Sequence, residues 1–275
     1  MGDLRMKEKT MKVTFKVFRF NPAVDTSGRW AKYEVEIDRA TTVLDALLKI
    51  KETIDPTLSV RFSCRQAVCG SCGMMINGKQ RLACFTRVFE LNSDTVIVEP
   101  LRNLPIIKDL VTDFSDLFAK EKKIKPYIIR PDTEEMVKPT GMYLQSEKEL
   151  LDYLQFADCI ECGMCSSACP TYATDRLFLT PMILNKAYRF SADSRDFGFE
   201  ERLPELDSEH GCWRCHFATA CSSVCPKGVD PAKSIQLLKK IIIYQTTSEI
   251  FGRTTRKKKT QLFLRPHINI DDLNI

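Results

Sequence analysis

Residues 159–170 read CIECGMCSSACP, and this segment decides the fold of the second half of the chain. Its four cysteines are Cys159, Cys162, Cys165 and Cys169, and Pro170 closes the segment. Thiolates are the common ligands of iron–sulfur clusters, and a Cys-x2-Cys-x2-Cys-x3-Cys-Pro segment gives three thiolates to one cluster and the fourth to another. The segment therefore predicts a second cysteine-rich segment further along the chain.

The second segment reads RCHFATACSSVCPKG over residues 214–228, and its last cysteine is again followed by a proline. When the two segments exchange their fourth thiolates, one cluster receives four thiolates in all. We predict a 4Fe-4S cluster held by Cys159, Cys162, Cys165 and Cys225.

The other cluster of this pair has one ligand fewer. In the register of the first segment, Ala218 stands where a cysteine is expected, and alanine cannot bind iron. The three remaining thiolates predict a 3Fe-4S cluster, whose lower ligand charge should raise its reduction potential relative to an equivalent four-thiolate site. Its predicted ligands are Cys169, Cys215 and Cys221.

Two alternatives apply to these cysteines. Four cysteines at short spacing also bind zinc, but zinc sites use separated Cys-x2-Cys pairs, whereas these thiols lie in one tight turn. Cys212, three residues before Cys215, could supply a fourth thiolate to the second cluster. Because Cys212 precedes the segment and does not occupy the vacant corner, we expect it to be a spectator.

The N-terminal part, residues 11–120, is predicted to form a domain of its own. Residues 11–20 alternate between apolar and polar and predict a strand, as do residues 30–37 and 95–98. Apolar residues recur at helical spacing from about Thr42, and Pro56 marks the end of that helix. Two strands, a crossing helix and a cysteine-bearing loop are the element order of a β-grasp ferredoxin domain.

The loop after this helix reads FSCRQAVCGSCG over residues 62–73 and carries a third set of thiols. A Cys-x4-Cys-x2-Cys spacing followed by a distant cysteine is the plant-type arrangement for a 2Fe-2S cluster. The predicted ligands are Cys64, Cys69, Cys72 and Cys84.

Glycines explain how such a loop could close around a cluster. Gly70 and Gly73 are expected to permit the φ values and the close approach by which backbone N–H groups reach sulfur. Asn77-Gly78 is the strongest short signal for a hairpin, and we predict that this hairpin returns Cys84 to the cluster.

The rest of the chain is predicted to be helical, which makes the fold class α+β. Ser146 and Glu149 have the spacing of a capping box, and the leucines that follow, Leu150, Leu151 and Leu154, are expected to form a buried stripe. Helices are predicted around residues 179–190 and from Asp230 onward. We place the domain break within residues 105–140, with an all-helical dicluster domain over 140–245 and a basic tail over 246–275.

Composition restricts the class of protein. The chain has 275 residues and 12 cysteines, and its N-terminus lacks the apolar region of a signal peptide, so we expect a reducing compartment. Lys and Arg total 41 against 36 Asp and Glu, which is a mixed surface unlike that of a nucleic-acid binder. The sequence contains no run of 18 apolar residues, so we predict no membrane-spanning helix.

The basic run at residues 253–259, RTTRKKK, admits two interpretations. Such a run is usually a solvated tail, and it could also attract anionic lipid or an acidic subunit. We favour the solvated tail because no amphipathic pattern accompanies the charges.

The whole arrangement resembles the iron–sulfur subunit of succinate dehydrogenase and fumarate reductase. The likeness covers residues 11–245 and includes SCRQAVCGSCGMMINGKQRLAC, the PMILNKAYRF and DSRD stretches, and RCHFATACSSVCPKG. The resemblance implies an electron-transfer subunit between a flavoprotein with covalent FAD and a membrane anchor that binds quinone. The 2Fe-2S cluster would face the flavin, the 4Fe-4S cluster would lie between, and the 3Fe-4S cluster would face the quinone.

The resemblance also implies a place in the cell and quinone contacts. The subunit would lie peripherally on the cytoplasmic face of a prokaryotic inner membrane, held by its partner subunits. Pro170 and His216 match quinone-contacting positions of the family, whereas Thr174 stands where the family frequently has tryptophan. His210 and His267 lack such a context and are expected at the surface.

No substrate chemistry is expected on this chain alone, because it has no GxGxxG nucleotide-binding fingerprint and the flavin must sit on another chain. One alternative is a soluble dicluster carrier that acts without an anchor. Another is the iron–sulfur subunit of a thiol- or glycolate-linked oxidoreductase, whose two full four-cysteine segments Ala218 argues against. The direction, succinate oxidation or fumarate reduction, stays open.

Overall fold

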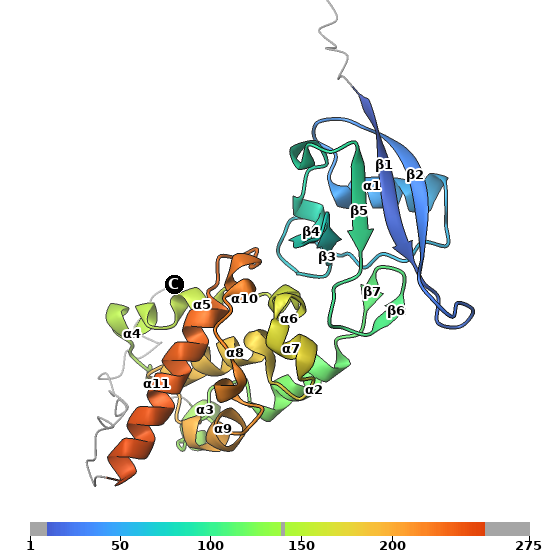
Figure 1. Cartoon of the computed structure of the whole chain (residues 1–275). Coiled ribbons are helices and arrows are strands. Elements are labelled where there is room, and N and C mark those ends of the chain that lie inside the picture. The colour runs from blue at the N-terminus through green and yellow to red at the C-terminus, as the bar shows by residue number, and fades with distance from the viewer. Residues whose placement is uncertain (1–9, 139–140, 251–275) are drawn as a thin grey trace, which may run out of the picture. The chain divides into compact units, whose positions relative to one another are not determined.

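A computed structural model of the chain describes residues 10–138 and 141–250 (Figure 1). The chain forms two compact units, each assembled from separate stretches of sequence. Of the described residues, unit 1 comprises 10–116, 160–174 and 220–228, and unit 2 comprises 117–138, 141–159, 175–219 and 229–250. The predicted domains were consecutive segments, whereas these units alternate along the chain, so parts of both cysteine segments fold with the N-terminal residues.

Unit 1 contains a five-stranded mixed sheet of order β2-β1-β5-β3-β4. The strands are β1 (Met11–Arg19), β2 (Arg29–Ile37), β3 (Gly73–Ile76), β4 (Lys79–Leu82) and β5 (Thr95–Glu99). Strand β1 runs antiparallel to β2 and parallel to β5, and β3 is antiparallel to both of its neighbours. The predicted β-grasp arrangement is confirmed.

The core of unit 1 lies between this sheet and helix α1 (Val43–Thr53). Alternate residues of β1, namely Val13, Phe15 and Val17, are buried, which is the pattern of a strand with one face on a core. Helix α1 begins where predicted, because Thr42 and Asp45 form a reciprocal capping box.

The remaining elements of unit 1 are short. They are η1 (Ala83–Phe85), η2 (Phe89–Leu91), the β6–β7 hairpin (Ile106–Lys108 and Val111–Thr112), α6 (Met164–Ala168), α7 (Pro170–Thr174) and α10 (Ala220–Ser223). Helices α6 and α10 come from the two cysteine segments and pack against each other.

In the described part of unit 2 every regular element is a helix. The elements are α2 (Ser115–Lys123, whose first two residues lie in unit 1), α3 (Thr133–Val137), α4 (Glu147–Leu151), α5 (Leu154–Ala157), α8 (Thr180–Ala192), α9 (Phe199–Leu206), η3 (Cys212–Arg214) and α11 (Pro231–Ile250). Helix α11 packs on α8, and its side chains Ile235, Leu238 and Ile242 are buried. None of the helices described is long and apolar enough to cross a bilayer.

The predicted leucine stripe before Cys159 is wrong. Leu150, Leu151 and Leu154 are 36%, 61% and 43% exposed. Helix α4 ends at Leu151 and α5 begins at Leu154, so the leucines do not lie along one continuous helix. Tyr153 and Phe156 are the side chains that become buried.

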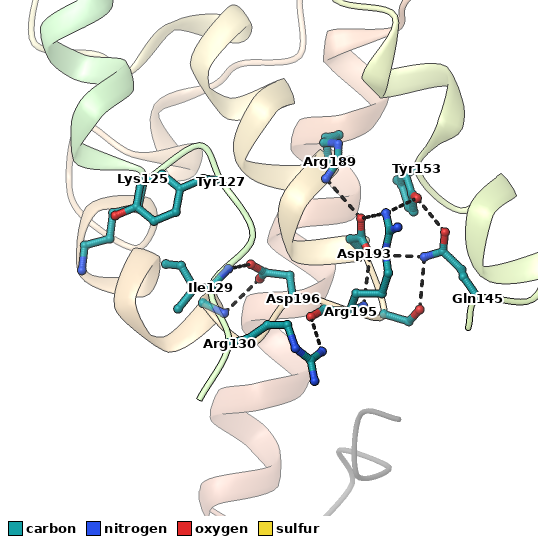
Figure 2. A network of polar contacts seen from close by, with 12 residues as sticks. Lys125, Tyr127, Ile129, Arg130, Gln145, Tyr153, Arg189, Asp193, Arg195 and Asp196 are labelled. Atoms are coloured by element: carbon teal, nitrogen blue, oxygen red, sulfur yellow. Dashed lines mark hydrogen bonds and ion pairs between the residues drawn. The ribbon is translucent and has the colours of Figure 1, made fainter. Parts of the chain in front are cut away.

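Buried acidic side chains hold this part of unit 2 together. Figure 2 shows Asp193, at the end of α8, accepting hydrogen bonds from Arg189, Arg195 and Gln145. The Tyr153 hydroxyl donates to the Oε1 atom of Gln145 at 2.7 Å, which ties the segment before Cys159 to the same network.

Asp196 makes a second buried network close by in the sequence. Its carboxylate accepts from the Ile129 N–H at 3.0 Å and from Nη1 of Arg202 at 2.7 Å, and both partners of this ion pair have 0% exposed side chains. Arg202 also donates to the carbonyls of Ile124, Lys125 and Tyr127. The pair therefore joins the loop after α2 to helix α9.

Replacing Asp196 with alanine is expected to lower the free energy of unfolding by about 3–5 kcal/mol, because a buried guanidinium would lose its carboxylate. Urea denaturation of the purified chain measures this loss. Glu201→Ala is the control, since the Lys125–Glu201 ion pair is partly exposed and should be worth about 1 kcal/mol or less. Equal losses in the two variants would contradict the prediction.

Candidate metal centres

The first set of predicted ligands lies on the loop between α1 and β3 and on η1. Cys72 directly precedes β3, and Cys84 lies in η1 directly after β4. Strands β3 and β4 pair as a hairpin through Asn77 and Gly78, both with positive φ. The predicted return of Cys84 by a hairpin is confirmed.

Backbone N–H groups converge on these four sulfurs. The Sγ atom of Cys64 accepts from the N–H groups of Val68 at 3.3 Å and Cys69 at 3.2 Å. The Cys64 N–H in turn reaches the Sγ atom of Cys69 at 3.5 Å. Such N–H groups stabilise the negative charge of thiolates and of a bound cluster.

The two other sulfurs are supported in the same way. The Ala67 N–H reaches the Sγ atom of Cys84 at 3.3 Å, and the Cys84 N–H reaches the Sγ atom of Cys72 at 3.4 Å. Residues 64 to 84 thus form one connected set of thiols and donors, which fits a 2Fe-2S cluster. Among the described residues, no group of three or more His, Cys, Asp or Glu side chains is arranged to hold a single metal ion.

Several residues of this loop have left-handed backbone angles, which let the chain turn sharply. Gly70 has φ +74°, as expected, but Arg65 and Ala67 have φ +56° and +59°. These two positions were missed, because the sequence shows only ordinary residues there. Gly73 begins β3 without a positive φ, so the expectation about its backbone angle was wrong.

The environments of two of these thiols differ strongly. The Ser71 hydroxyl and the Cys64 N–H lower the pKa of Cys69 to about 6. Burial raises the pKa of Cys72 to about 12. Both residues would hold iron as thiolates, since bound iron would supply positive charge that favours the deprotonated form.

The first cysteine segment forms a tight turn followed by a short helix. Glu161 and Gly163 have φ +55° and +71°, and short helix α6 follows. Cys162, Cys165 and Cys169 are all buried. The Tyr172 N–H reaches the Sγ atom of Cys169 at 3.5 Å, which repeats the N–H to sulfur pattern of the first loop.

The second cysteine segment behaves similarly. Phe217 and Thr219 have φ +58° and +57°, and the Phe217 N–H reaches the Sγ atom of Cys215 at 3.4 Å. Cys221 lies on α10, which packs on α6. The structure therefore brings together the parts of the segments that bear Cys162, Cys165, Cys169, Cys221 and Cys225, all in unit 1. Cys159 and Cys215 belong to unit 2, so the two complete ligand sets stay predictions.

The 2Fe-2S loop and the first cysteine segment touch through their backbones. A Cβ atom added at Gly70 would lie 2.8 Å from the Cβ atom and 3.0 Å from the Cα atom of Cys162. A Cβ atom at Gly73 would lie 3.4 Å from the Cys162 carbonyl oxygen. Two predicted metal-binding loops are thus in direct contact within unit 1, and the glycines permit this contact.

Cys212 is the cysteine that was predicted to be a spectator. It has 0% exposure in η3, and burial raises the pKa of its thiol to about 12. Lys239 of α11 donates to the carbonyl of the neighbouring predicted ligand Cys215 at 3.1 Å, a contact for which the sequence gave no signal.

We expect Cys212→Ser to keep the iron content per chain unchanged, because a spectator thiol contributes no ligand. Iron analysis together with the EPR spectrum of the oxidised protein measures this. Cys221→Ser is the comparison variant and should lose iron. Loss of iron in both variants would show that Cys212 is a ligand.

The predicted quinone contacts and the remaining histidines differ in their exposure. Pro170 and His216 are exposed, as quinone-contacting residues would need to be. His210 was expected at the surface, but it is half-buried and its Nδ1 atom lies 2.9 Å from Asp175, which also accepts from Arg214. His267 lies outside the described residues.

Asp175 is the acceptor of this small cluster. Burial acts against its ionisation, but hydrogen bonds from His210, the Leu177 N–H and Arg214 keep the pKa of Asp175 below its ordinary value. The resulting carboxylate fixes Arg214, the residue directly before Cys215.

Comparison with known proteins identifies the families that this chain resembles. A family described as a 2Fe-2S iron–sulfur cluster binding domain matches residues 14–119, and one described as a 4Fe-4S dicluster domain matches residues 155–229. A chain of the solved Mycobacterium smegmatis Sdh1 complex in the apo form has a TM-score of 0.76 and 27% identity, covering 87% of this chain and 98% of that chain.

Two named relatives are closer in sequence. The fumarate reductase iron–sulfur subunit of Escherichia coli O6:H1 is 44% identical over 228 residues, which are 83% of this chain and 91% of the relative. The subunit of the same name from Mycobacterium tuberculosis is 43% identical over 228 residues, or 83% of this chain and 92% of the relative. The chain belongs to the family of fumarate reductase and succinate dehydrogenase iron–sulfur subunits.

Proposed function

We propose that this chain relays electrons between a flavoprotein subunit and membrane quinone through 2Fe-2S, 4Fe-4S and 3Fe-4S clusters. The observation that carries the proposal is the backbone contact between Gly70 of the 2Fe-2S loop and Cys162 of the 4Fe-4S segment. Electron transfer slows steeply with distance, and at Gly70 the two loops approach so closely that an added Cβ atom would lie 2.8 Å from the Cβ atom of Cys162. When bound, the clusters supply one-electron carriers, and the chain supplies thiolates, N–H donors and burial.

The partners follow from the relatives. Those relatives are named as subunits, and the matched structure is a complex. We place this chain beside an FAD-containing flavoprotein and a membrane anchor, peripherally on the cytoplasmic face of a prokaryotic inner membrane. The exposed apolar side chains Val68 and Phe85 beside the 2Fe-2S loop would then be covered by a partner.

Quinone would be reduced or oxidised near the second cysteine segment. Pro170 and His216 are exposed next to predicted 3Fe-4S ligands. Thr174 is exposed on α7 and is smaller than tryptophan, so we expect the quinone site to be shaped by other residues here. Phe217, 52% exposed directly after His216, offers an aromatic surface.

An EPR-monitored redox titration of the purified complex tests the proposal. We expect three distinct centres, one of them paramagnetic when oxidised. Chemical analysis should give about nine iron and about ten sulfide per chain. Finding only two centres, or zinc in place of iron, would refute the relay.

The solution state of the protein separates the proposal from a soluble dicluster carrier. A carrier acting alone would be purified as an active soluble monomer. The proposal expects quinone-dependent activity only in membrane-derived preparations that retain the flavoprotein and the anchor.

A further inference from the structure

Helix α6 carries predicted ligands at both ends and is too short to hold them by itself. It spans Met164–Ala168, with Cys165 near its start and Cys169 directly after it. Isolated helices shorter than about 12 residues are marginal in water, so a five-residue helix depends on outside contacts. Pro170 has no N–H and cannot extend the hydrogen bonds of α6.

Asn103 provides such a contact from a distant part of the sequence. Its Nδ2 atom donates to the carbonyl of Ser167 at 2.9 Å and to the carbonyl of Cys169 at 3.4 Å. Asn103 has φ +61°, a left-handed conformation that asparagine tolerates better than most residues. This backbone angle directs a short amide side chain to the end of α6.

Two more residues of the same connector, residues 101–116, contact the first cysteine segment or helix α7, which follows it. The Phe114 ring lies against Gly163, where an added Cβ atom would meet it at 3.0 Å. The Tyr172 hydroxyl donates to the Asp116 carboxylate at 3.0 Å. The connector therefore contacts the segment before α6, at its end and within α7, all inside unit 1.

We propose that Asn103 is a positioning residue for the 3Fe-4S centre. By holding the carbonyl of Cys169, its amide fixes the backbone from which the Cys169 thiolate reaches the cluster. The Ala173 N–H, at 3.1 Å from the same carbonyl, and the Tyr172 N–H at Sγ complete the fixation of this residue. This inference rests on the proposed function, which assigns Cys169 to a three-iron cluster.

The amide also has an electrostatic effect. Its N–H groups present the positive end of a dipole to the residue that would carry a negatively charged cluster. Charge and hydrogen bonds near a cluster set its reduction potential. Removing the donor should lower the potential of the 3Fe-4S centre, and a carboxylate in its place should lower it further.

Two variants and a matched control test the proposal in the full complex. Asn103→Gly keeps the left-handed backbone and removes the amide, and Asn103→Asp keeps the shape but replaces the donor with a negative charge. Asn92→Gly is the control, because Asn92 is an exposed asparagine of unit 1 with φ +46°. EPR redox titration reads all centres in one sample, so the 2Fe-2S centre serves as an internal reference.

We expect the potential of the three-iron centre to fall in the order unmodified protein, Asn103→Gly, Asn103→Asp. Its signal per chain should drop at least twofold in Asn103→Asp, with the 2Fe-2S signal unchanged and Asn92→Gly like the unmodified protein. An unchanged three-iron potential in both Asn103 variants would overturn the proposal, as would equal shifts or equal losses at every centre. A missing three-iron signal in the unmodified complex would instead refute the proposed function, and this inference with it.

Discussion

Replacing Gly70 with alanine is expected to abolish or strongly reduce the 2Fe-2S signal and to interrupt electron flow. Gly70 has φ +74°, where a side chain costs about 1–2 kcal/mol. The new methyl carbon would also lie 2.8 Å from the Cβ atom of Cys162 and 3.0 Å from the carbonyl oxygen of Ile160. Both neighbours belong to a cysteine segment with little freedom to move, so the two metal-binding loops would be forced apart.

Gly78→Ala separates the two causes. Gly78 has nearly the same backbone angle, φ +76°, but an added Cβ atom there meets nothing within 4 Å. This variant should suffer the backbone cost alone and keep both the iron content and the quinone-dependent activity. EPR spectra of the reduced proteins and turnover of the complexes measure the difference. Equal behaviour of the two alanine variants would mean that the contact with Cys162 has no role in assembly.

The features that the sequence predicted correctly are local. The capping box at Ser146 depends on residues three apart, the helix start near Thr42 depends on the spacing of nearby apolar residues, and the hairpin at Asn77-Gly78 depends on two adjacent residues. Cysteine spacing is also a local signal, but the complete ligand sets that it gives stay predictions. Such signals can be recognised in a single sequence without knowing which residues pack against them.

The features that were missed need contacts between distant residues. Nothing near residue 103 indicates that its amide would contact Ser167 and Cys169. Arg65 and Ala67 adopt left-handed backbone angles in a loop whose N–H groups turn toward sulfur. Arginine and alanine are not residue types that indicate such angles in a sequence. The leucines around 150 were misassigned because they do not lie along one continuous helix.

The alternation of the two units along the chain has a consequence for assembly. Residues 160–174 and 220–228 belong to unit 1, although the chain between and around them belongs to unit 2. A cut at the predicted boundary near residue 140 would separate α6 from Asn103, Phe114 and Asp116. The three cluster sites are therefore expected to form together, because the connector supports the segment that carries ligands of two of them.

Replacing Ala218 with cysteine is expected to convert the three-iron centre into a four-iron centre. In the register of the first segment, position 218 is the vacant corner, and it is exposed between two left-handed residues, Phe217 and Thr219. A thiolate there would supply the missing ligand, so iron should rise from about nine to about ten per chain. The added negative charge should lower the potential of that centre and slow electron transfer to quinone.

Ala218→Ser is the matched control, because a hydroxyl has nearly the size of a thiol and is a poor ligand for iron in such clusters. The cysteine variant should lose the EPR signal of the oxidised protein and gain one in the reduced protein, whereas the serine variant should keep the original spectrum. An oxidised three-iron signal of full intensity in the cysteine variant would show that position 218 does not face the vacant corner. The register that pairs the two cysteine segments would then be wrong, and Cys212 would become the leading candidate for a further ligand.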